Sequence, residues 1–168
     1  MKRMEEKLKD TTLLFLVRCD DTGVITEICL AMKKRGFGMG KWNGVGGKLE
    51  PGESIEDAAR RETEEEIGVR VGKLRPVAQL EFMYSVRPGW DQLVHVFFAD
   101  EWEEEPTESE EMRPGWYAVS DIPFDSMWPD DRIWLPEVLG GNLIRGRFVF
   151  GEGETIIEHE ISAVPDFD

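Results

Sequence analysis

Three glutamates in the middle of the chain have the residue type and spacing of ligands for a divalent cation. Glu62, Glu65 and Glu66 lie at positions i, i+3 and i+4 of a predicted helix, so their carboxylates share one helical face. Hard oxygen ligands of this kind, together with water and substrate phosphates, are what Mg²⁺ prefers. The same residues could instead form a solvated acidic face, and on their own they do not decide between the two.

Local energetics make this cluster a candidate functional site, with the solvated acidic face still open as the alternative. Four-residue spacing predicts that Arg60 pairs with Glu64, and that Arg61 pairs with Glu65. The other two glutamates of the cluster have no partner at that spacing, and two glutamates four residues apart repel one another. The cluster also lies toward the C-terminal half of the helix, where negative charge is unfavourable. A sequence that violates two local preferences marks a candidate functional site.

A local basic segment precedes the acidic helix. Residues 28–49 contain no Asp or Glu, but they contain five Lys or Arg residues and six glycines. Glycines let the backbone approach a ligand, and lysines supply point charges for phosphates, so the segment predicts an anion-binding loop. A flexible loop between strands is the alternative. Neither GxGxxG after a strand nor GxxxxGK[ST] occurs, so the standard nucleotide fingerprints are missing.

A second group of residues has the chemistry to recognise a purine. Trp128 offers a stacking face, and Asn43 can both donate and accept hydrogen bonds. If Asp130 and Asp131 are both buried, desolvation and repulsion raise the pKa of at least one, which leaves a protonated acid that can donate. The alternative is that the aspartates cap a helix and that the tryptophan is an ordinary core residue.

The elements that must position these residues are strands before and after one strong helix. Strands are expected at 11–18, 24–32, 74–84, 93–99, 116–119, 143–150 and 155–164, and a short helix at 131–139. Ser54, with an acid three residues later, predicts the start of the main helix, and Gly68 predicts its end. We therefore expect one α+β domain over residues 1–168, with a core at about 11–162.

Composition limits the partners of the protein. The 168 residues carry a formal net charge of −15, which disfavours nucleic-acid polymers and anionic membranes. The N-terminal basic residues are not followed by an apolar segment long enough for a secretory signal. The two cysteines have no metal-like spacing, and they indicate a reduced, cytoplasmic protein. We expect a monomer, because a strongly acidic surface opposes self-association.

The wider string around the helix resembles the Nudix box, GX5EX7REUXEEXGU. Gly47, Glu53, Arg61 and the following residues to Val69 match every fixed Gly, Glu and Arg position, and Thr63 replaces the usual aliphatic residue. The resemblance implies an α/β/α sandwich with a mixed sheet, in which the box forms a loop–helix–loop. It also implies hydrolysis of nucleoside diphosphates linked to a further group, with Mg²⁺ or Mn²⁺ as cofactor.

Beyond the box, the chain is similar to the branch of the Nudix family that hydrolyses oxidised purine nucleoside triphosphates. The resemblance implies that Glu53 and Arg61 orient the metal-binding carboxylates. It implies metal ligands at Glu62, Glu65, Glu66, Glu111 and the backbone of Gly46. The implied substrate-binding set is Thr12, Lys33, Phe37, Asn43, Val45, Gly46, Gly47, Lys48, Phe82, Gln92, Trp128, Pro129, Asp130 and Asp131. Gln92 departs from the methionine that is usual there, which leaves the base preference open.

The expected function is therefore Mg²⁺-dependent hydrolysis of 8-oxo-dGTP and 2-oxo-dATP to monophosphate and pyrophosphate. One alternative is a Nudix hydrolase of ADP-ribose, a dinucleoside polyphosphate or an unmodified nucleoside triphosphate. A second is a non-catalytic nucleotide-binding module, against which the intact glutamates argue. A simple acidic ion binder would not explain the basic segment or the Trp-Pro-Asp-Asp sequence.

Overall fold

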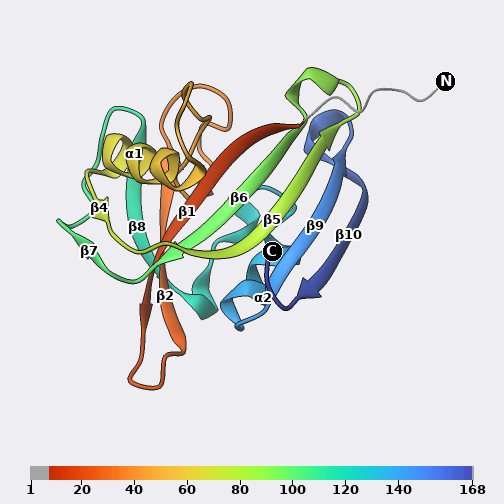
Figure 1. Ribbon diagram of the computed structural model, residues 1–168. Coiled ribbons are helices and arrows are strands. Elements are labelled where there is room, and N and C mark those ends of the chain that lie inside the picture. The colour runs from red at the N-terminus through yellow and green to blue at the C-terminus, as the bar shows by residue number, and fades with distance from the viewer. Residues whose placement is uncertain (1–7, 168) are drawn as a thin grey trace.

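A mixed β-sheet lies at the centre of the computed structural model, which describes residues 8–167 (Figure 1). Strand order in the main sheet is β10-β9-β5-β6-β1-β2-β3, with β8 also paired to β2. The pairs β1–β6 and β5–β9 are parallel, and the other pairs of this sheet are antiparallel. Residues 1–7, for which no secretory signal is expected, and residue 168 of the expected domain lie outside the described residues.

The strands of the main sheet are β1 (Lys9–Cys19), β2 (Ile25–Lys33), β3 (Trp42–Asn43), β5 (Arg75–Tyr84), β6 (Gln92–Ala99), β8 (Met112–Ala118), β9 (Leu143–Phe150) and β10 (Ile156–Val164). A separate two-stranded sheet contains β4 (Arg70–Val71) and β7 (Trp102–Glu103). Four 3-10 turns lie at Pro88–Trp90, Val119–Asp121, Phe124–Ser126 and Glu152–Glu154. Within the described residues, two helices, α1 (Ile55–Ile67) and α2 (Asp131–Leu139), complete the fold.

The central strand β1 is covered on both faces. Successive residues of a strand point to opposite faces. Leu14 and Leu16 accordingly belong to one hydrophobic core, while Phe15 and Val17 belong to a second core on the other side of the sheet. All four side chains are almost completely buried. The sheet is therefore the middle layer of a sandwich.

Helix α1 covers one face of the sheet, and its ends lie where the capping signals predict. The Ser54 hydroxyl oxygen accepts a hydrogen bond from the Asp57 N–H at 3.1 Å, and Gly68 ends the helix with a φ of 72°. Ala59 and Ile67 pack into the core that contains Leu14. The glutamates of α1 lie on its other faces, and Glu66 is the only one of them that is buried.

Helix α2 lies against the opposite face (Figure 1). Its residues Trp134, Leu135 and Val138 are buried in the core that contains Phe15. Pro136 falls inside this short helix. The mixed sheet between two helices confirms the predicted α+β class.

Several element boundaries differ from the prediction. Strand β8 begins at Met112 instead of residue 116, because Pro114 and Gly115 are accommodated in its pairing with β2. The acidic segment after residue 99, where no strand is expected, contains β7, which pairs with β4. None of the helices within residues 8–167 is long and apolar enough to cross a membrane.

Candidate active site

The loop before α1 packs against β1 at backbone-to-backbone distance. The Thr12 N–H donates to the Gly47 carbonyl at 2.9 Å, and the Leu14 N–H donates to the Val45 carbonyl at 2.7 Å. A Cβ atom at Gly46 would stand 1.8 Å from the Thr12 carbonyl oxygen, and one at Gly47 would stand 2.8 Å from a Glu62 oxygen. This closeness explains the glycines, because no side chain fits at either position.

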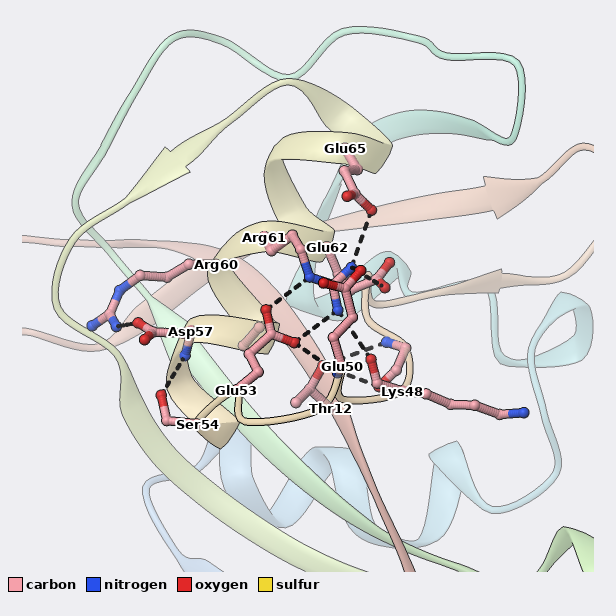
Figure 2. A network of polar contacts seen from close by, with 12 residues as sticks. Thr12, Lys48, Glu50, Glu53, Ser54, Asp57, Arg60, Arg61, Glu62 and Glu65 are labelled. Carbon is pink, nitrogen blue, oxygen red and sulfur yellow. Dashed lines mark hydrogen bonds and ion pairs between the residues drawn. The ribbon is translucent and has the colours of Figure 1, made fainter.

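Arg61, in the middle of α1, is the centre of a network of ion pairs (Figure 2). Its Nε and Nη2 donate to the two oxygens of Glu53 at 2.8 and 2.9 Å, which is bidentate geometry. Nη2 also donates to the Lys48 carbonyl at 3.1 Å. These hydrogen bonds from Arg61 lower the pKa of Glu53 to about 2. The pair therefore ties the loop to the helix as a fixed unit.

The third guanidinium nitrogen of Arg61, Nη1, contacts two of the glutamates that are predicted to bind a metal ion. Its Nη1 lies 2.9 Å from Glu62 and 3.3 Å from Glu65. The expected pairing with Glu65 is thus confirmed, but Glu62 also has a partner, because the guanidinium bends back along the helix to reach its neighbour in sequence.

The predicted pairing of Arg60 with Glu64 is wrong. Arg60 contacts Asp57 at 3.3 Å and donates to the Gly72 carbonyl, while Glu64 pairs with Arg70 at 3.2 Å. The segment after Gly68 returns beside the helix and supplies these nearer partners.

Glu66 is the buried member of the acidic cluster. Its side chain is only 7% exposed, and its Oε2 accepts a hydrogen bond from the Gly46 N–H at 3.2 Å. Burial, with a further contribution from the nearby charge of Glu62, raises the pKa of Glu66 to about 8. Burial also raises the pKa of Glu62. The side chains of Glu62 and Glu66 therefore crowd negative charge together, and the nearby positive groups do not fully compensate it.

A hollow of about 290 Å³ opens beside this crowded charge. It is lined by Glu62, Glu65, Glu66 and Glu111, together with Arg35, Ser109 and Glu110. In residues 8–167 no three acidic, His or Cys side chains are already close enough to hold an ion. Arg61 holds Glu62 and Glu65, and Arg35 lies 3.5 Å from Glu111. The donor set fits a hard divalent cation, which would neutralise the negative charge that is crowded there.

A larger cleft of about 840 Å³ lies next to the acidic hollow. The residues predicted to bind substrate that line it are Thr12, Lys33, Phe37, Asn43, Gly46, Gly47, Lys48, Phe82, Gln92, Trp128, Asp130 and Asp131. Gly46 connects the two spaces, because it lines the cleft while its N–H binds Glu66 of the hollow. One ligand can therefore extend from the cleft to the acidic hollow.

Aromatic rings form the mouth of the cleft. The ring centroids of Phe37 and Trp128 are 5.1 Å apart, and so are those of Phe37 and Trp90. The Lys41 Nζ lies 5.0 Å from the centroid of a Trp128 ring. Phe37 is 58% exposed and Trp90 is 41% exposed. Flat, partly exposed rings of this kind suit the stacking of a heterocycle.

Two buried acids lie deeper in the cleft. Asp130 and Asp131 are 3% and 2% exposed. The Trp134 Nε1–H donates to Asp130 at 2.8 Å, whereas Asp131 Oδ2 is buried with no hydrogen-bond partner. Burial raises the pKa of Asp130 to about 6. Burial, and then the charge of Asp130, raise the pKa of Asp131 well above its ordinary value.

Comparisons with known proteins agree with this geometry. The model of the NUDIX domain matches residues 9–138. The chain belongs to the Nudix family. Two similar relatives are both named oxidized purine nucleoside triphosphate hydrolase. The one from Danio rerio is 47% identical over 142 residues, covering 83% of this chain and 89% of the relative. The one from Mus musculus is 45% identical over 141 residues, covering 84% and 90%.

Solved structures support the Nudix fold. A mutator MutT protein from Bacillus halodurans superimposes with a TM-score of 0.78 at 24% identity, covering 92% of this chain and 97% of that chain. The Nudix α/β/α architecture expected from the sequence is thereby confirmed. Nudix hydrolases use a divalent metal ion, in agreement with the acidic hollow.

Two predicted substrate-binding residues of this Nudix protein do not line the cleft. Val45 is 3% exposed and packs in the core beneath α1, because its backbone pairs with β1 and turns its side chain inward. Pro129 is half-buried between two lining residues without lining the cleft itself.

Other cleft residues are absent from the predicted site. They are Thr11, Leu13, Ala31, Gly38, Lys41, Gly44, Tyr84, Val86, Arg87, Trp90, Val94, Met112, Phe150, Glu152, Gly153 and Glu154. Tyr84 and Trp90 flank the turn between β5 and β6, and their aromatic character next to a turn was the one signal available. Glu154 could not be found from sequence, because its 3.1 Å ion pair with Lys41 joins segments that are far apart in the chain.

Proposed function

We propose that this Nudix protein hydrolyses oxidised purine nucleoside triphosphates, such as 8-oxo-dGTP and 2-oxo-dATP, to the monophosphate and pyrophosphate. Its role would then be to remove damaged nucleotides from the pool. The observation that carries the proposal is the buried Asp130–Asp131 pair in an aromatic cleft, with one Asp131 oxygen unsatisfied. The names of the two vertebrate relatives support the same substrate class.

The acid pair suits a base whose edge mixes donors and acceptors. A buried polar atom without a partner is costly, so an incoming donor or acceptor there is strongly favoured. Because burial raises both pKa values, the pair can hold one proton and can both donate and accept. Oxidation of a purine changes such donor and acceptor positions, since it adds a carbonyl and an N–H.

Asn43 and Trp128 complete the recognition of the base. The Asn43 Oδ1 accepts from the Gly44 N–H at 2.8 Å, which leaves the amide NH₂ group to donate to the ligand. Trp128 supplies a stacking face, worth about 1–3 kcal/mol per base. Together they orient a planar heterocycle toward the acids.

The phosphates would extend toward the acidic hollow. Lys33 and Lys48 line the cleft on the side of Gly46 and Gly47, and they supply positive charge for a triphosphate. Glu62, Glu65, Glu66, Glu111 and the Gly46 backbone would hold Mg²⁺. When bound, Mg²⁺ supplies charge neutralisation at phosphorus and a water of lowered pKa. Arg61 and Glu53 hold the loop and the helix in a fixed relative position, which would keep these ligands aligned.

We further propose that the chain is one Nudix domain that acts as a cytoplasmic monomer. The main sheet takes strands from Lys9 to Val164, so the described residues share one central layer. Neither described cysteine, Cys19 or Cys29, forms a disulfide, in keeping with a reducing compartment.

The test is product analysis with a nucleotide panel and Mg²⁺. Oxidised purine triphosphates should yield monophosphate and pyrophosphate, and Asn43→Ala should reduce kcat/KM for them far more than for a pyrimidine triphosphate. Turnover of ADP-ribose or dinucleoside polyphosphates with no cleavage of oxidised purines would overturn the proposal. Binding of nucleotides without any turnover would also overturn it.

A further inference from the structure

One ion pair joins two sides of the cleft. Lys41 directly precedes β3, and Glu154 lies in the turn between β9 and β10. Strands β3 and β10 stand at opposite ends of the strand order of the main sheet. The Lys41 Nζ nevertheless lies 3.1 Å from Glu154 Oε2, and both residues line the cleft. The pair therefore bridges the cleft from one end of the sheet to the other.

The backbone of Glu154 adopts a conformation that is unusual for its residue type. Its φ is 64°, in the left-handed region, and within residues 8–167 Glu104 is the other non-glycine residue with a positive φ. A side chain in this region costs free energy that a glycine would not cost, and such positions cluster at functional sites. The turn is closed by a hydrogen bond from the Thr155 hydroxyl to the Glu152 carbonyl at 2.8 Å, which does not involve the Glu154 side chain. The Glu154 carboxylate is thus not needed to form the turn, and its role lies in the contact with Lys41.

Lys41 connects the bridge to Trp128. Its Nζ lies 5.0 Å from the centroid of a Trp128 ring, which is within the range of a cation–π contact. The Lys41 N–H donates to the Gly38 carbonyl at 3.0 Å, and a Cβ atom at Gly38 would stand 3.1 Å from Trp128 Cζ2. The ring of Phe37, in the same loop, has its centroid 5.1 Å from that of Trp128. The loop formed by residues 36–41 therefore restricts the orientation of the Trp128 ring.

The exposure of the pair limits what it can contribute to folding. The side chain of Lys41 is 24% exposed and that of Glu154 is 47% exposed. An ion pair that is this open to solvent contributes little to the free energy of unfolding. The lysine stem, however, is flexible, and a fixed counter-charge selects among its conformations. Glu154 therefore matters chiefly for where it holds the Lys41 ammonium, which is beside the Trp128 ring.

We infer that Glu154 and Lys41 are positioning residues for the base, because Glu154 holds the Lys41 ammonium against Trp128 and this contact keeps the ring in the orientation in which a purine stacks. The inference rests on the proposed function, since it assumes that the base stacks on Trp128. A stacking face contacts every purine, so the bridge should affect oxidised and unmodified purines alike. The chemical step should not depend on it, because the reacting phosphate lies at the acidic hollow.

The test measures kcat, KM and the free energy of unfolding for Glu154→Gly and Lys41→Met. Each variant should raise KM for purine triphosphates by about three- to tenfold and change kcat by less than about twofold. Glu154→Gly should do so without loss of stability, because glycine relieves the left-handed backbone. Lys41→Arg keeps a cation for both Glu154 and the ring, and its KM should stay within about twofold of wild type.

Two further variants isolate the contact with Trp128. In a Trp128→Ala background, Glu154→Gly or Lys41→Met should change kcat/KM by less than about twofold, because the ring that the bridge positions is gone. The matched control is Glu104→Gly, which removes a left-handed glutamate that does not line the cleft. It relieves the same backbone conformation and should leave KM unchanged.

An unchanged KM in the two cleft variants, a fall in kcat at unchanged KM, or the same loss in the Trp128→Ala background would overturn the inference. A rise in KM in Glu104→Gly would do so as well. If either Glu154→Gly or Lys41→Met does not fold, the other is judged by the same criteria. These outcomes are scored on any purine triphosphate that the protein hydrolyses, whereas a wild-type protein without preference for oxidised purines would contradict the proposed function.

Discussion

Glu66 links the fold to the proposed chemistry at the scale of single residues. It is buried, it accepts a hydrogen bond from Gly46, and it lines the hollow with four other glutamates. An uncharged amide of the same shape keeps the packing but loses the ligand charge. Replacing Glu66 by glutamine should therefore reduce turnover much more than it affects folding or binding of the base.

We predict that Glu66→Gln reduces kcat by more than the roughly 10–100-fold that follows loss of a supporting partner of a metal ligand. Nucleotide binding, measured by calorimetry without turnover, should stay within a few-fold of wild type. Glu64→Gln is the matched control, because Glu64 lies on the exposed face and pairs with Arg70. Unchanged turnover in Glu66→Gln would remove the metal assignment.

The acid pair predicts a pH dependence of stability. Burial raises the pKa of Asp130 to about 6 from an ordinary 3.8. A carboxyl with a raised folded-state pKa favours folding fully below its unfolded pKa, and this contribution is lost as pH rises through about 6. At neutral pH the ionised acid thus costs stability that it does not cost at pH 4.

Asp130→Asn should therefore stabilise the protein at pH 7.5 by about 1–3 kcal/mol and give no gain at pH 4. The amide keeps an oxygen to accept from Trp134, so the helix contact survives. Chemical denaturation at the two pH values measures the difference. Asp125→Asn, at an exposed position, should show no pH-dependent gain. A gain of equal size at both pH values would disprove the electrostatic cause.

At the scale of elements, the loop between β3 and α1 depends on the absence of side chains. Gly46→Ala should lower the free energy of unfolding by about 3 kcal/mol or more, because its Cβ would meet the Thr12 carbonyl at 1.8 Å. Gly72→Ala is the control, since nothing lies within 4 Å of its Cβ position, and it should change stability by no more than about 0.5 kcal/mol. Denaturant titration of both variants is the measurement, and equal stability would contradict the packing described.

Sequence predicted α1 closely because its ends are set by local chemistry. Ser54 and Gly68 each act within one turn, so no distant contact is needed to place them. Strand β8 was placed too late because Pro114 and Gly115 are poor strand formers, and only pairing with β2 makes them extended. The acid pair was recognised, whereas Tyr84 and Phe150 were not, because β5 meets β9 only through the fold.

At the scale of the whole molecule, charge and surface predict a monomer. The net charge of −15 gives mutual repulsion between copies. The exposed aromatic residues Phe37 and Trp90 gather at the cleft mouth, where a ligand would cover them. Light scattering after size exclusion should give the mass of one chain at both low and high salt. A dimer that persists at both would contradict the expectation.

The most direct test of the central claim is the ratio of kcat/KM for 8-oxo-dGTP to kcat/KM for dGTP, measured with wild-type protein and Mg²⁺ by pyrophosphate release. Recognition by the buried acids, Asn43 and Trp128 predicts a ratio of at least about tenfold, the value of roughly one well-made hydrogen bond to a charged group. A ratio near one, with dGTP turned over as fast as the oxidised nucleotide, would contradict the claim that this cleft selects damaged purines.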